Sequence, residues 1–402
     1  MQRDKTNKKL VTAALLIVIL VIIQIGDSYC SELFDKVQSL FLKDLVMQPL
    51  DMSLNEATVM VNAVSIPFYI IAAMAPLLRG LADYLGKKKV LLINLFLYLP
   101  GLVLCMTTKN YIIFLIGNSL ISLSASVDIQ YIYVVSCIEE KKRASVRGIL
   151  AAAASLTASF VSVIRGITIN GRPYDYTKMY GTGIILIVFA AVIVFIFLPW
   201  DNNAAIPERT KRSYNGCDKC SHNLIYLWVI IFIWGIGTSG VKFYNEPMVS
   251  MRYKTEDLIN RIIFIQPIVT IIINIASGVM ADYLSRRKAV CIDIAATAIS
   301  VIIFNISDNF VITGIAYGIM IGAYFSATNI VMLMIMELSK ENRIGRNYAW
   351  ASIYNGAGNA AGMVLISILA KTAGIAAAKG IILIIPAVLT AVIIVISRQK
   401  VS

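Results

Sequence analysis

The stretch LADYLGKKK, residues 81–89, returns almost unchanged as MADYLSRRK, residues 280–288. Each copy follows an apolar run long enough to form a helix, and each ends in three consecutive basic residues. The two copies lie 199 residues apart, about half the length of the 402-residue chain. Self-similarity at a long offset indicates an internal repeat, so the chain is predicted to consist of two similar halves.

Two further pairs of segments occur in the same order along the two halves. Residues 25–28, IGDS, match residues 236–239, IGTS, and residues 126–129, SVDI, match residues 327–330, ATNI. In the second of these pairs Asp128 stands opposite the uncharged Asn329. The halves share this position, but the first half alone keeps a titratable group there, as expected if ion coupling is asymmetric.

Composition places the chain in a membrane. Apolar residues make up 58% of the chain and charged residues 15%, and the mean hydropathy is +0.77, which excludes an ordinary water-soluble domain. The apolar residues fall into twelve runs, each near the ~20 residues that a helix needs to cross a ~30 Å hydrocarbon core. We therefore predict an all-α membrane protein with twelve transmembrane helices in two pseudo-symmetric six-helix bundles.

The expected division is an N-terminal bundle at residues 1–200, a cytoplasmic linker at residues 201–223 and a C-terminal bundle at residues 224–402. The first helix is expected to begin near Leu10, and its end is left open because Asp27 and other acidic residues follow the apolar run. The remaining eleven helices are expected near residues 55–79, 88–108, 110–138, 144–168, 179–199, 224–249, 255–281, 289–306, 309–338, 346–372 and 374–396.

The net charge of +13 does not indicate a nucleic-acid partner. Of the 36 Lys and Arg residues, 24 fall in the even-numbered connections and the two tails, on one side of the predicted topology. The positive-inside rule accounts for this excess and places both termini in the cytoplasm. We expect a multi-pass, monomeric protein of a plasma membrane, of the bacterial inner or cell membrane type, with the lipid bilayer as its surroundings.

The repeated turn resembles the signature of the major facilitator superfamily, Gly-x-Leu-Ala-Asp-Arg-x-Gly-Arg-Lys. Residues 79–88 follow this pattern closely, and residues 278–287 form a degenerate second copy. The helix count, the size of the halves and the short linker agree with the same family, so the resemblance covers almost the whole chain. It implies a transporter whose two halves rock about a site near the middle of the membrane.

The two copies depart from the family pattern in the same place. Tyr84 and Tyr283 stand where Arg is usual, Arg79 replaces the first Gly, and Ser285 replaces a Gly in the second copy. The family's usual loop contacts are therefore in question. The resemblance implies that Asp83 latches a cytoplasmic gate, with Arg147 as a partner. The predicted gate residues are Asp83, Gly86, Lys87, Arg147 and Asp282.

Ionisable side chains inside membrane helices are costly and mark functional positions by default. Asp128 lies about ten residues from either end of the expected fourth helix, and the resemblance makes helices one, four, seven and ten the lining of the cavity. A carboxylate there can carry a proton reversibly, because burial favours its neutral form and a nearby cation its charged form. The alternative is a structural ion pair with Arg165 or Lys242.

Other candidates depend on helix boundaries. Asp27 follows Gln24 in the first helix and lies in mid-membrane if that helix continues, but at the interface if it stops near Tyr29. Lys242 and Glu246 are four residues apart on one face of the seventh helix, where they neutralise each other or hold a charged solute. The full set of predicted cavity residues is Asp128, Asp27, Lys242, Glu246, Asn329, Tyr324 and Gln24, with Arg165, Arg261, Tyr131 and Tyr317 as weaker candidates.

Two other signals are discounted. Residues 80–88 lack the Gly-Lys-Ser/Thr ending of a phosphate loop, so ATP hydrolysis is not supported. Cys217, Cys220 and His222 have ligand-like spacing, but a structural zinc needs four ligands and no second pair is visible. We therefore predict no metal, no cofactor and no enzymatic activity.

The sequence predicts a secondary active transporter that moves a small polar or charged solute by alternating access. Proton-coupled symport is favoured, because the Gly-Pro signature common on the fifth helix of antiporters is absent. Proton-driven efflux of drugs or metabolites is the first alternative. A sensor or lipid scramblase with a transporter fold is the second. The acidic residues of the first half favour a cation, and the bases of the seventh and eighth helices favour an anion.

Overall fold

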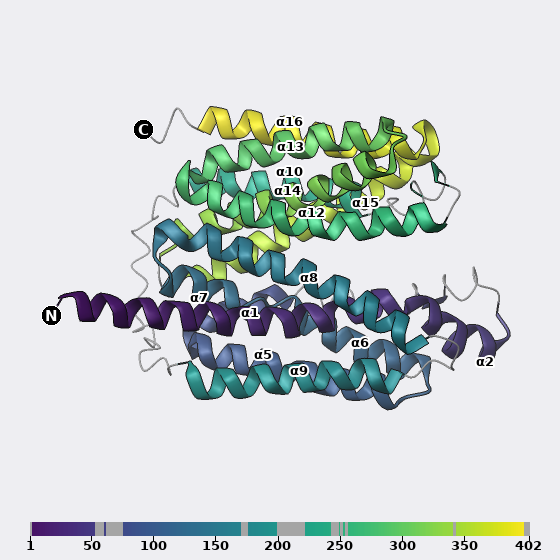
Figure 1. Cartoon of the computed structure of the whole chain (residues 1–402), viewed down its shortest axis with the longest axis horizontal. Helices are drawn as coiled ribbons and strands as arrows, with labels where there is room; N and C mark the ends of the chain where they lie inside the picture. Colours follow the sequence, from purple (N-terminus) through teal and green to yellow (C-terminus); the bar gives the residue numbers. More distant parts are fainter. Residues whose placement is uncertain are drawn as a thin grey trace, which may run out of the picture. The chain divides into compact units, whose positions relative to one another are not determined.

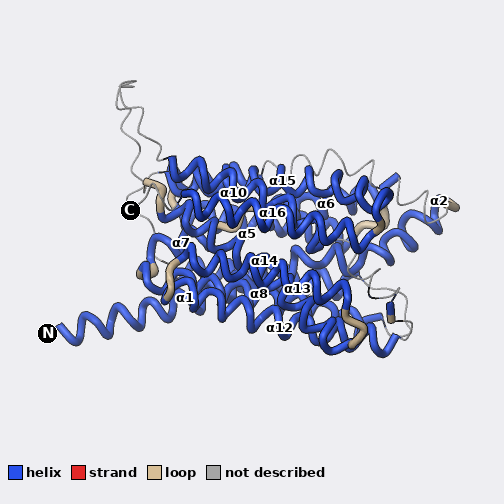
Figure 2. Tube along the Cα trace, turned by 90° about the horizontal axis from the view of Figure 1, so that it is seen from above, coloured by secondary structure: helices blue, strands red, loops and turns tan. Residues whose placement is uncertain are grey.

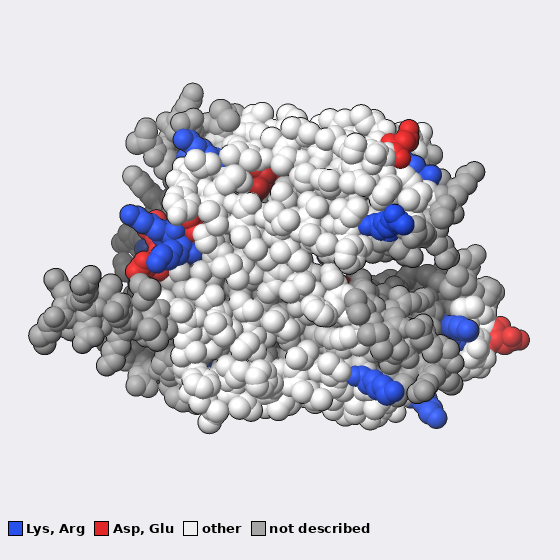
Figure 3. All heavy atoms as spheres, in the orientation of Figure 1, with Lys and Arg blue, Asp and Glu red and all other residues white. Residues whose placement is uncertain are grey.

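The computed structural model describes residues 2–52, 60–61, 75–169, 176–198, 222–242, 249, 252–253, 256–340 and 343–397. These residues form helices joined by short loops and no strand (Figure 2). Ten of the described helices are long and apolar enough to cross a membrane. On the face shown in Figure 3, most of the charged side chains lie near the two ends of the view, and the surface between them consists almost entirely of uncharged residues. The predicted all-α membrane fold is confirmed.

The chain divides into two compact units, Met1–Tyr133 with Leu156–Ile206 and Val134–Ser155 with Pro207–Ser402. The boundary passes through two helices, so residues 134–155 group with the second unit. The division of the sequence into two six-helix bundles and a linker stays a prediction.

The first unit holds most of the N-terminal helices (Figure 1). Its elements are α1 (Gln2–Phe41), the π-helix η1 (Leu42–Met47), α2 (Gln48–Leu50), the 3-10 helix η2 (Ala75–Leu81), α4 (Ala82–Leu85), α5 (Lys87–Thr107), α6 (Tyr111–Ala125) and α9 (Tyr176–Phe197). Helix α5 packs on α6 and α9, and α1 packs on α9 and α6. At the α5–α6 crossing a Cβ on Gly101 would lie 2.6 Å from the Gly117 carbonyl oxygen. Glycine is needed there because the two backbones touch.

The second unit contains the C-terminal helices. Its elements are the 3-10 helix η3 (Glu140–Lys142), α10 (His222–Lys242), α12 (Glu256–Tyr283), α13 (Arg286–Ile306), α14 (Phe310–Glu337), α15 (Ile344–Ala373) and α16 (Ile375–Ser397), while α7 (Gln130–Cys137) and α8 (Arg143–Ile169) run across the boundary. Helix α14 packs on α12 and α13, and α10 packs on α15 and α16. Gly358 of α15 meets Phe232 and Gly235 of α10. The two helix backbones therefore lie in close contact at this crossing.

The sequence does not fix where the first helix ends. In the structure this helix is α1, which ends at Phe41. This helix continues through Asp27 to Phe41 before it becomes the π-helix η1. Asp27 therefore lies inside a membrane-length helix, within the candidate span Ala13–Phe34. Residues 53–56, Ser-Leu-Asn-Glu, have the spacing of a capping box before the second expected helix, and they lie outside the described residues.

The prediction of one unbroken fourth helix was wrong. Helix α6 ends at Ala125 and α7 begins at Gln130, and between them Asp128 has a positive φ of 36°. Carbonyl groups freed by such a break need other donors inside a membrane protein. Arg79 supplies them, donating to the backbone oxygens of Ser126 and Val127 at 2.7 Å each.

The repeated turns share an unusual backbone. Gly86 and Ser285, at equivalent positions of the two copies, both have positive φ, 90° and 143°. This region favours glycine, so Ser285 adopts a conformation that its residue type rarely takes. The common geometry supports a true structural repeat.

Candidate functional site

A buried polar cluster forms around Asp27 in the first unit. Gln24, Asp27 and Ser28 lie on one face of α1, because residues three and four apart share a face, and all three are buried. Tyr98 of α5 donates its hydroxyl to the Asp27 carboxyl. Gln24 donates to Ser28 Oγ at 2.9 Å and accepts from Gln130 Nε2 at 3.3 Å, and Gln130 also faces Asp27.

Among the described residues, no cation is bonded to the Asp27 carboxyl. It is 5% exposed, and no ion pair between described residues includes it. Its hydrogen-bond donors are neutral. An ionised carboxylate in this setting is costly, so binding a proton is the reaction that this arrangement favours chemically.

Asp128, in contrast, is held in an ion pair. Its Oδ2 lies 2.9 Å from Nη2 of Arg79, a residue that is 3% exposed, whereas Asp128 is 28% exposed. This described partner differs from the two that the sequence suggests, Arg165 and Lys242. The missed signal was the departure of Arg79 from the family motif, in which Gly is expected.

The two residues of this ion pair are both replaced by uncharged residues at the equivalent positions of the second half. The position equivalent to Arg79 in the second half is Gly278, and the position equivalent to Asp128 is Asn329. A Cβ on Gly278 would lie 2.5 Å from the Ala144 oxygen, so no larger residue fits there. At these two positions the first half carries a cation and an anion, and the second half carries neither.

Asn329 and Arg147 meet in the second unit. Arg147 of α8 is 2% exposed and donates from Nη2 to Asn329 Oδ1 at 3.1 Å. Both residues line a small pocket together with Gly148, Gly278 and Ser326. The predicted contact of Arg147 with Asp83 stays a prediction, as do gate roles for the half-buried Asp83 and Lys87.

Asp282 binds the N-terminus of α8. Its carboxyl accepts from the backbone N–H groups of Ala144 at 3.1 Å and Ser145 at 2.7 Å, and from the Ser145 hydroxyl. Anions are stabilised at such helix ends, where the amide groups lack partners. This contact joins the second repeated turn to the start of the fifth expected helix.

An ionic network surrounds this capped helix end. Arg286 Nη1 lies 2.5 Å from Asp282 Oδ1, and Arg286 Nη2 lies 3.1 Å from Glu337. Arg286 also donates to the Glu140 oxygen at 2.6 Å, and Arg143 lies 3.5 Å from Glu337. The network connects η3 and α8 with α12, α13 and α14, and sequence reasoning found only Asp282 and Arg147 in this region.

The second unit has an aromatic cluster where the first has Asp27. The repeat places Thr238 opposite Asp27. Thr238 Oγ1 lies 2.8 Å from the Tyr324 hydroxyl, which donates to the Trp234 backbone oxygen. The rings of Trp234 and Tyr324 stack at 4.6 Å, and Trp234 Nε1 donates to Thr328 at 3.1 Å. Tyr324, a predicted cavity residue, is buried in this cluster.

Several predicted residues cannot be placed. Glu246 lies outside the described residues, and so do the side chains of Lys242 and Arg165 and the Cys217–Cys220 pair. Arg261 is exposed and lies 6.0 Å from the ring of Phe310. Among the described residues, no group of three or more His, Cys, Asp or Glu side chains could hold a metal ion.

Ten membrane-length helices among the described residues, with buried polar clusters within them, define a polytopic membrane protein. The family profile of the Major Facilitator Superfamily matches residues 28–254, more than half of the chain. The chain belongs to this superfamily.

Known proteins resemble the chain at two levels. A Caenorhabditis elegans protein, "Proton myo-inositol cotransporter hmit-1.1", is 30% identical over 161 residues, which are 36% of this chain and 26% of that protein. The chain thus matches only about a quarter of this relative.

Solved structures share the fold over nearly the whole chain. The human organic anion transporter MFSD10 has a TM-score of 0.78 at 12% identity and covers 95% of this chain and 99% of its own. The proton:xylose symporter XylE has a TM-score of 0.76 at 12% identity, with 96% and 95% coverage. The E. coli fucose:proton symporter FucP has a TM-score of 0.69 at 13% identity, with 96% and 98% coverage.

Proposed function

We propose that the chain is a proton-coupled symporter that moves a small, neutral, hydroxylated solute of sugar or polyol type by alternating access. The observation that carries this proposal is Asp27, a buried carboxyl in a membrane helix whose described hydrogen-bond partners, Tyr98 and Gln130, are neutral. We further propose that both termini face the cytoplasm and that the membrane is a plasma membrane, as the distribution of Lys and Arg supports.

Asp27 is the proton carrier in this proposal, rather than Asp128. Arg79 neutralises Asp128 and bonds to the adjacent carbonyls, so Asp128 is committed to holding the helix break. Asp27 forms no ion pair with a described residue. Taking up a proton removes the charge that makes its burial costly, and releasing the proton restores it. Conformations that hydrate or bury Asp27 are therefore coupled to proton binding.

The solute class follows from the uncharged polar groups beside Asp27. Gln24 and Gln130 offer amide donors and acceptors that suit the hydroxyl groups of a sugar or polyol. The names of the myo-inositol relative and of the xylose and fucose symporters support the same class.

The network at Asp282 is the cytoplasmic gate in this proposal. It ties the start of α8 to α12, α13 and α14 through the capping carboxylate and through Arg286. Contacts of this kind can break and re-form during a conformational cycle, since they are made of separate hydrogen bonds and ion pairs. Opening toward the cytoplasm would require Asp282 to leave the Ser145 amide.

The test is solute flux into proteoliposomes that contain the purified full chain. Labelled pentose, hexose and cyclitol are compared with a labelled organic anion, each with and without an imposed pH gradient. We expect accumulation of a hydroxylated solute that requires the gradient. Asp27→Asn should abolish accumulation but keep solute exchange at equal concentrations, because the binding site remains while the proton carrier is lost.

Asp293→Asn is the matched control. Asp293 of α13 is also a buried carboxyl with a hydroxyl donor, Ser277, and we expect its variant to keep gradient-driven accumulation. Gradient-driven uptake that survives in Asp27→Asn would refute the proton-carrier role. Gradient-driven export, or transport of the organic anion alone, would contradict symport of a neutral solute and favour the antiporter. Absence of all solute flux would favour the sensor or lipid scramblase.

A further inference from the structure

The basic residues of the two repeated turns have different environments. Lys88 and Arg287 are equivalent by the 199-residue offset. Lys88 is 1% exposed, and its Nζ donates to the backbone oxygens of Phe195 at 2.9 Å and Leu198 at 2.5 Å. The first-half cation therefore caps the C-terminus of α9, where helix carbonyls lack partners.

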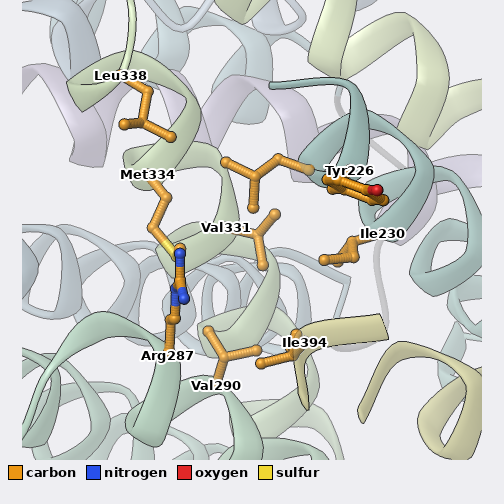
Figure 4. Close-up of a pocket in the computed structure, with 9 residues that line it drawn as sticks. Tyr226, Ile230, Arg287, Val290, Val331, Met334, Leu338 and Ile394 are labelled. Carbon is orange, nitrogen blue, oxygen red and sulfur yellow. The ribbon is translucent and has the colours of Figure 1, made fainter. Parts of the chain in front are cut away.

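Arg287 has no corresponding role. It is half-buried in the first turn of α13, and no hydrogen bond or ion pair between described residues includes it. It lines a small pocket between α10, α13, α14 and α16. Figure 4 shows Arg287 extending beside Met334, with Tyr226 and Ile230 on another side of the pocket.

The rest of the lining is almost entirely apolar. Apart from Arg287 and Tyr226, it consists of aliphatic and methionine side chains, among them Leu227, Ile230, Val331, Met334 and Ile394. A single guanidinium on an apolar wall suits a ligand with an anionic head and a hydrocarbon tail. A fully polar anion would leave the wall unused, and a plain hydrocarbon would leave the cation without a partner.

The pocket lies at the helix ends that carry the second basic turn. Tyr226 is near the start of α10, Leu338 directly follows α14, and Ile394 is near the end of α16. Just before Arg287 in the chain, Tyr283 is 86% exposed and Leu284 is 49% exposed. Exposed Tyr at the end of a membrane helix is typical of the lipid headgroup level, so a membrane lipid has direct access.

We propose that this pocket binds one anionic phospholipid of the cytoplasmic leaflet, with its phosphate on Arg287 and an acyl chain between α10, α14 and α16. The assignment of the leaflet rests on the orientation proposed above; the site itself is independent of the proton carrier. Lys288, exposed beside it, adds positive charge but does not line the pocket. Basic residues next to membrane helices attract anionic lipids.

The test uses native mass spectrometry of the full chain in detergent, titrated with phosphatidylglycerol or with phosphatidylcholine of the same acyl chains. We expect the parent protein to prefer phosphatidylglycerol and to retain one molecule. Arg287→Gln should weaken that binding by about fivefold or more, the order expected for one basic residue at an anionic interface. Arg287→Lys, which keeps the charge, should retain most of it.

Two further variants distinguish lipid binding in the pocket from nonspecific attraction of lipid by surface charge. Lys288→Gln makes the same change in charge one residue away and should leave the single tightly bound lipid in place. Met334→Trp fills the pocket without changing charge and should reduce retention of the lipid. Equal losses in Arg287→Gln and Lys288→Gln, or unchanged binding in Arg287→Gln, would overturn the proposal.

Excess inorganic phosphate identifies the source of the anion. We expect it to leave phosphatidylglycerol bound, because free phosphate gains nothing from the apolar wall. Displacement of the lipid by phosphate would show that the site takes a soluble anion instead and would also overturn the proposal.

Discussion

At the scale of single residues, the two halves differ through paired changes rather than isolated ones. Arg79 and Asp128 occur together in the first half, and the equivalents Gly278 and Asn329 occur together in the second. A buried charge without a partner is far more costly than either a pair or no charge at all. Neither arrangement leaves a lone buried charge at these positions. Asp27 differs, because it is a buried carboxyl whose described hydrogen-bond partners are neutral.

The Arg79–Asp128 pair gives a prediction about stability. Arg79→Gln removes the partner of Asp128 and the donors to two carbonyl groups, which we expect to destabilise the protein by about 1–3 kcal/mol. The double variant Arg79→Gln with Asp128→Asn should recover part of this loss, because no lone carboxylate remains. Thermal unfolding of the purified variants in one detergent measures the loss in the single variant and the recovery in the double variant. A double variant whose loss equals the sum of the single losses would show that the two residues are not coupled.

At the scale of elements, the crossing of α8 and α12 depends on two glycines. A Cβ on Gly148 would lie 2.5 Å from the Asn274 oxygen, and one on Gly278 would lie 2.5 Å from the Ala144 oxygen. The backbones are in contact, so the capped end of α8 cannot accept a side chain at this point. The glycines fix the spacing at which Asp282 reaches the Ser145 amide.

Gly148→Val should therefore disturb transport. Overpacking of this kind costs about 1–3 kcal/mol and separates α8 from α12, so we expect loss of flux and a lower melting temperature. Gly356→Val in α15 is the matched control, because a Cβ there meets nothing within 4 Å. It makes the same chemical change in a helix and should keep flux near the parent value. Equal flux in the two variants would contradict a role for the close α8–α12 contact.

Asp282→Asn tests the capping contact itself. The neutral amide still accepts a hydrogen bond but loses the interaction of the charge with the helix end, a loss of about 0.3–1 kcal/mol at exposed sites and up to ~2 when partly buried. We expect faster hydrogen exchange at the amides of Ala144 and Ser145, measured by mass spectrometry. Asp308→Asn, on an exposed loop, should leave exchange at these amides unchanged. Unaltered exchange in Asp282→Asn would argue against the gate proposal.

At the scale of the whole molecule, a proton moving with a neutral solute transfers one positive charge per cycle. A membrane potential should then drive uptake, since one charge moving through 100 mV is worth ~2.3 kcal/mol, or about 50-fold accumulation. We expect a potassium diffusion potential, negative inside, to drive accumulation in proteoliposomes without a pH gradient. A solute anion carried with one proton would show no such dependence, so potential-independent transport would contradict the neutral-solute assignment.

Much of the fold could be read from the sequence. The apolar runs predict helices, because in lipid only a helix satisfies its backbone hydrogen-bonding groups within one segment. The observed boundaries of α5, α8, α9 and α12 to α16 lie close to the expected ones. The repeated turn correctly indicated the superfamily, whose profile matches the chain. It also supplied the alignment of the halves that relates Lys88 to Arg287 and Arg79 to Gly278.

The class of protein, the membrane-spanning pattern and the equivalent positions of the two halves follow from the amino-acid sequence alone. The contacts made at those positions became visible in the folded chain: α1 continues past Asp27, the fourth span breaks at Asp128, and Arg79 pairs with this carboxylate. The physical reason is that hydropathy and helix periodicity are local properties of a segment. Partners of buried charges come from other helices, such as Arg79, 49 residues away from Asp128, and their identity depends on how those helices pack.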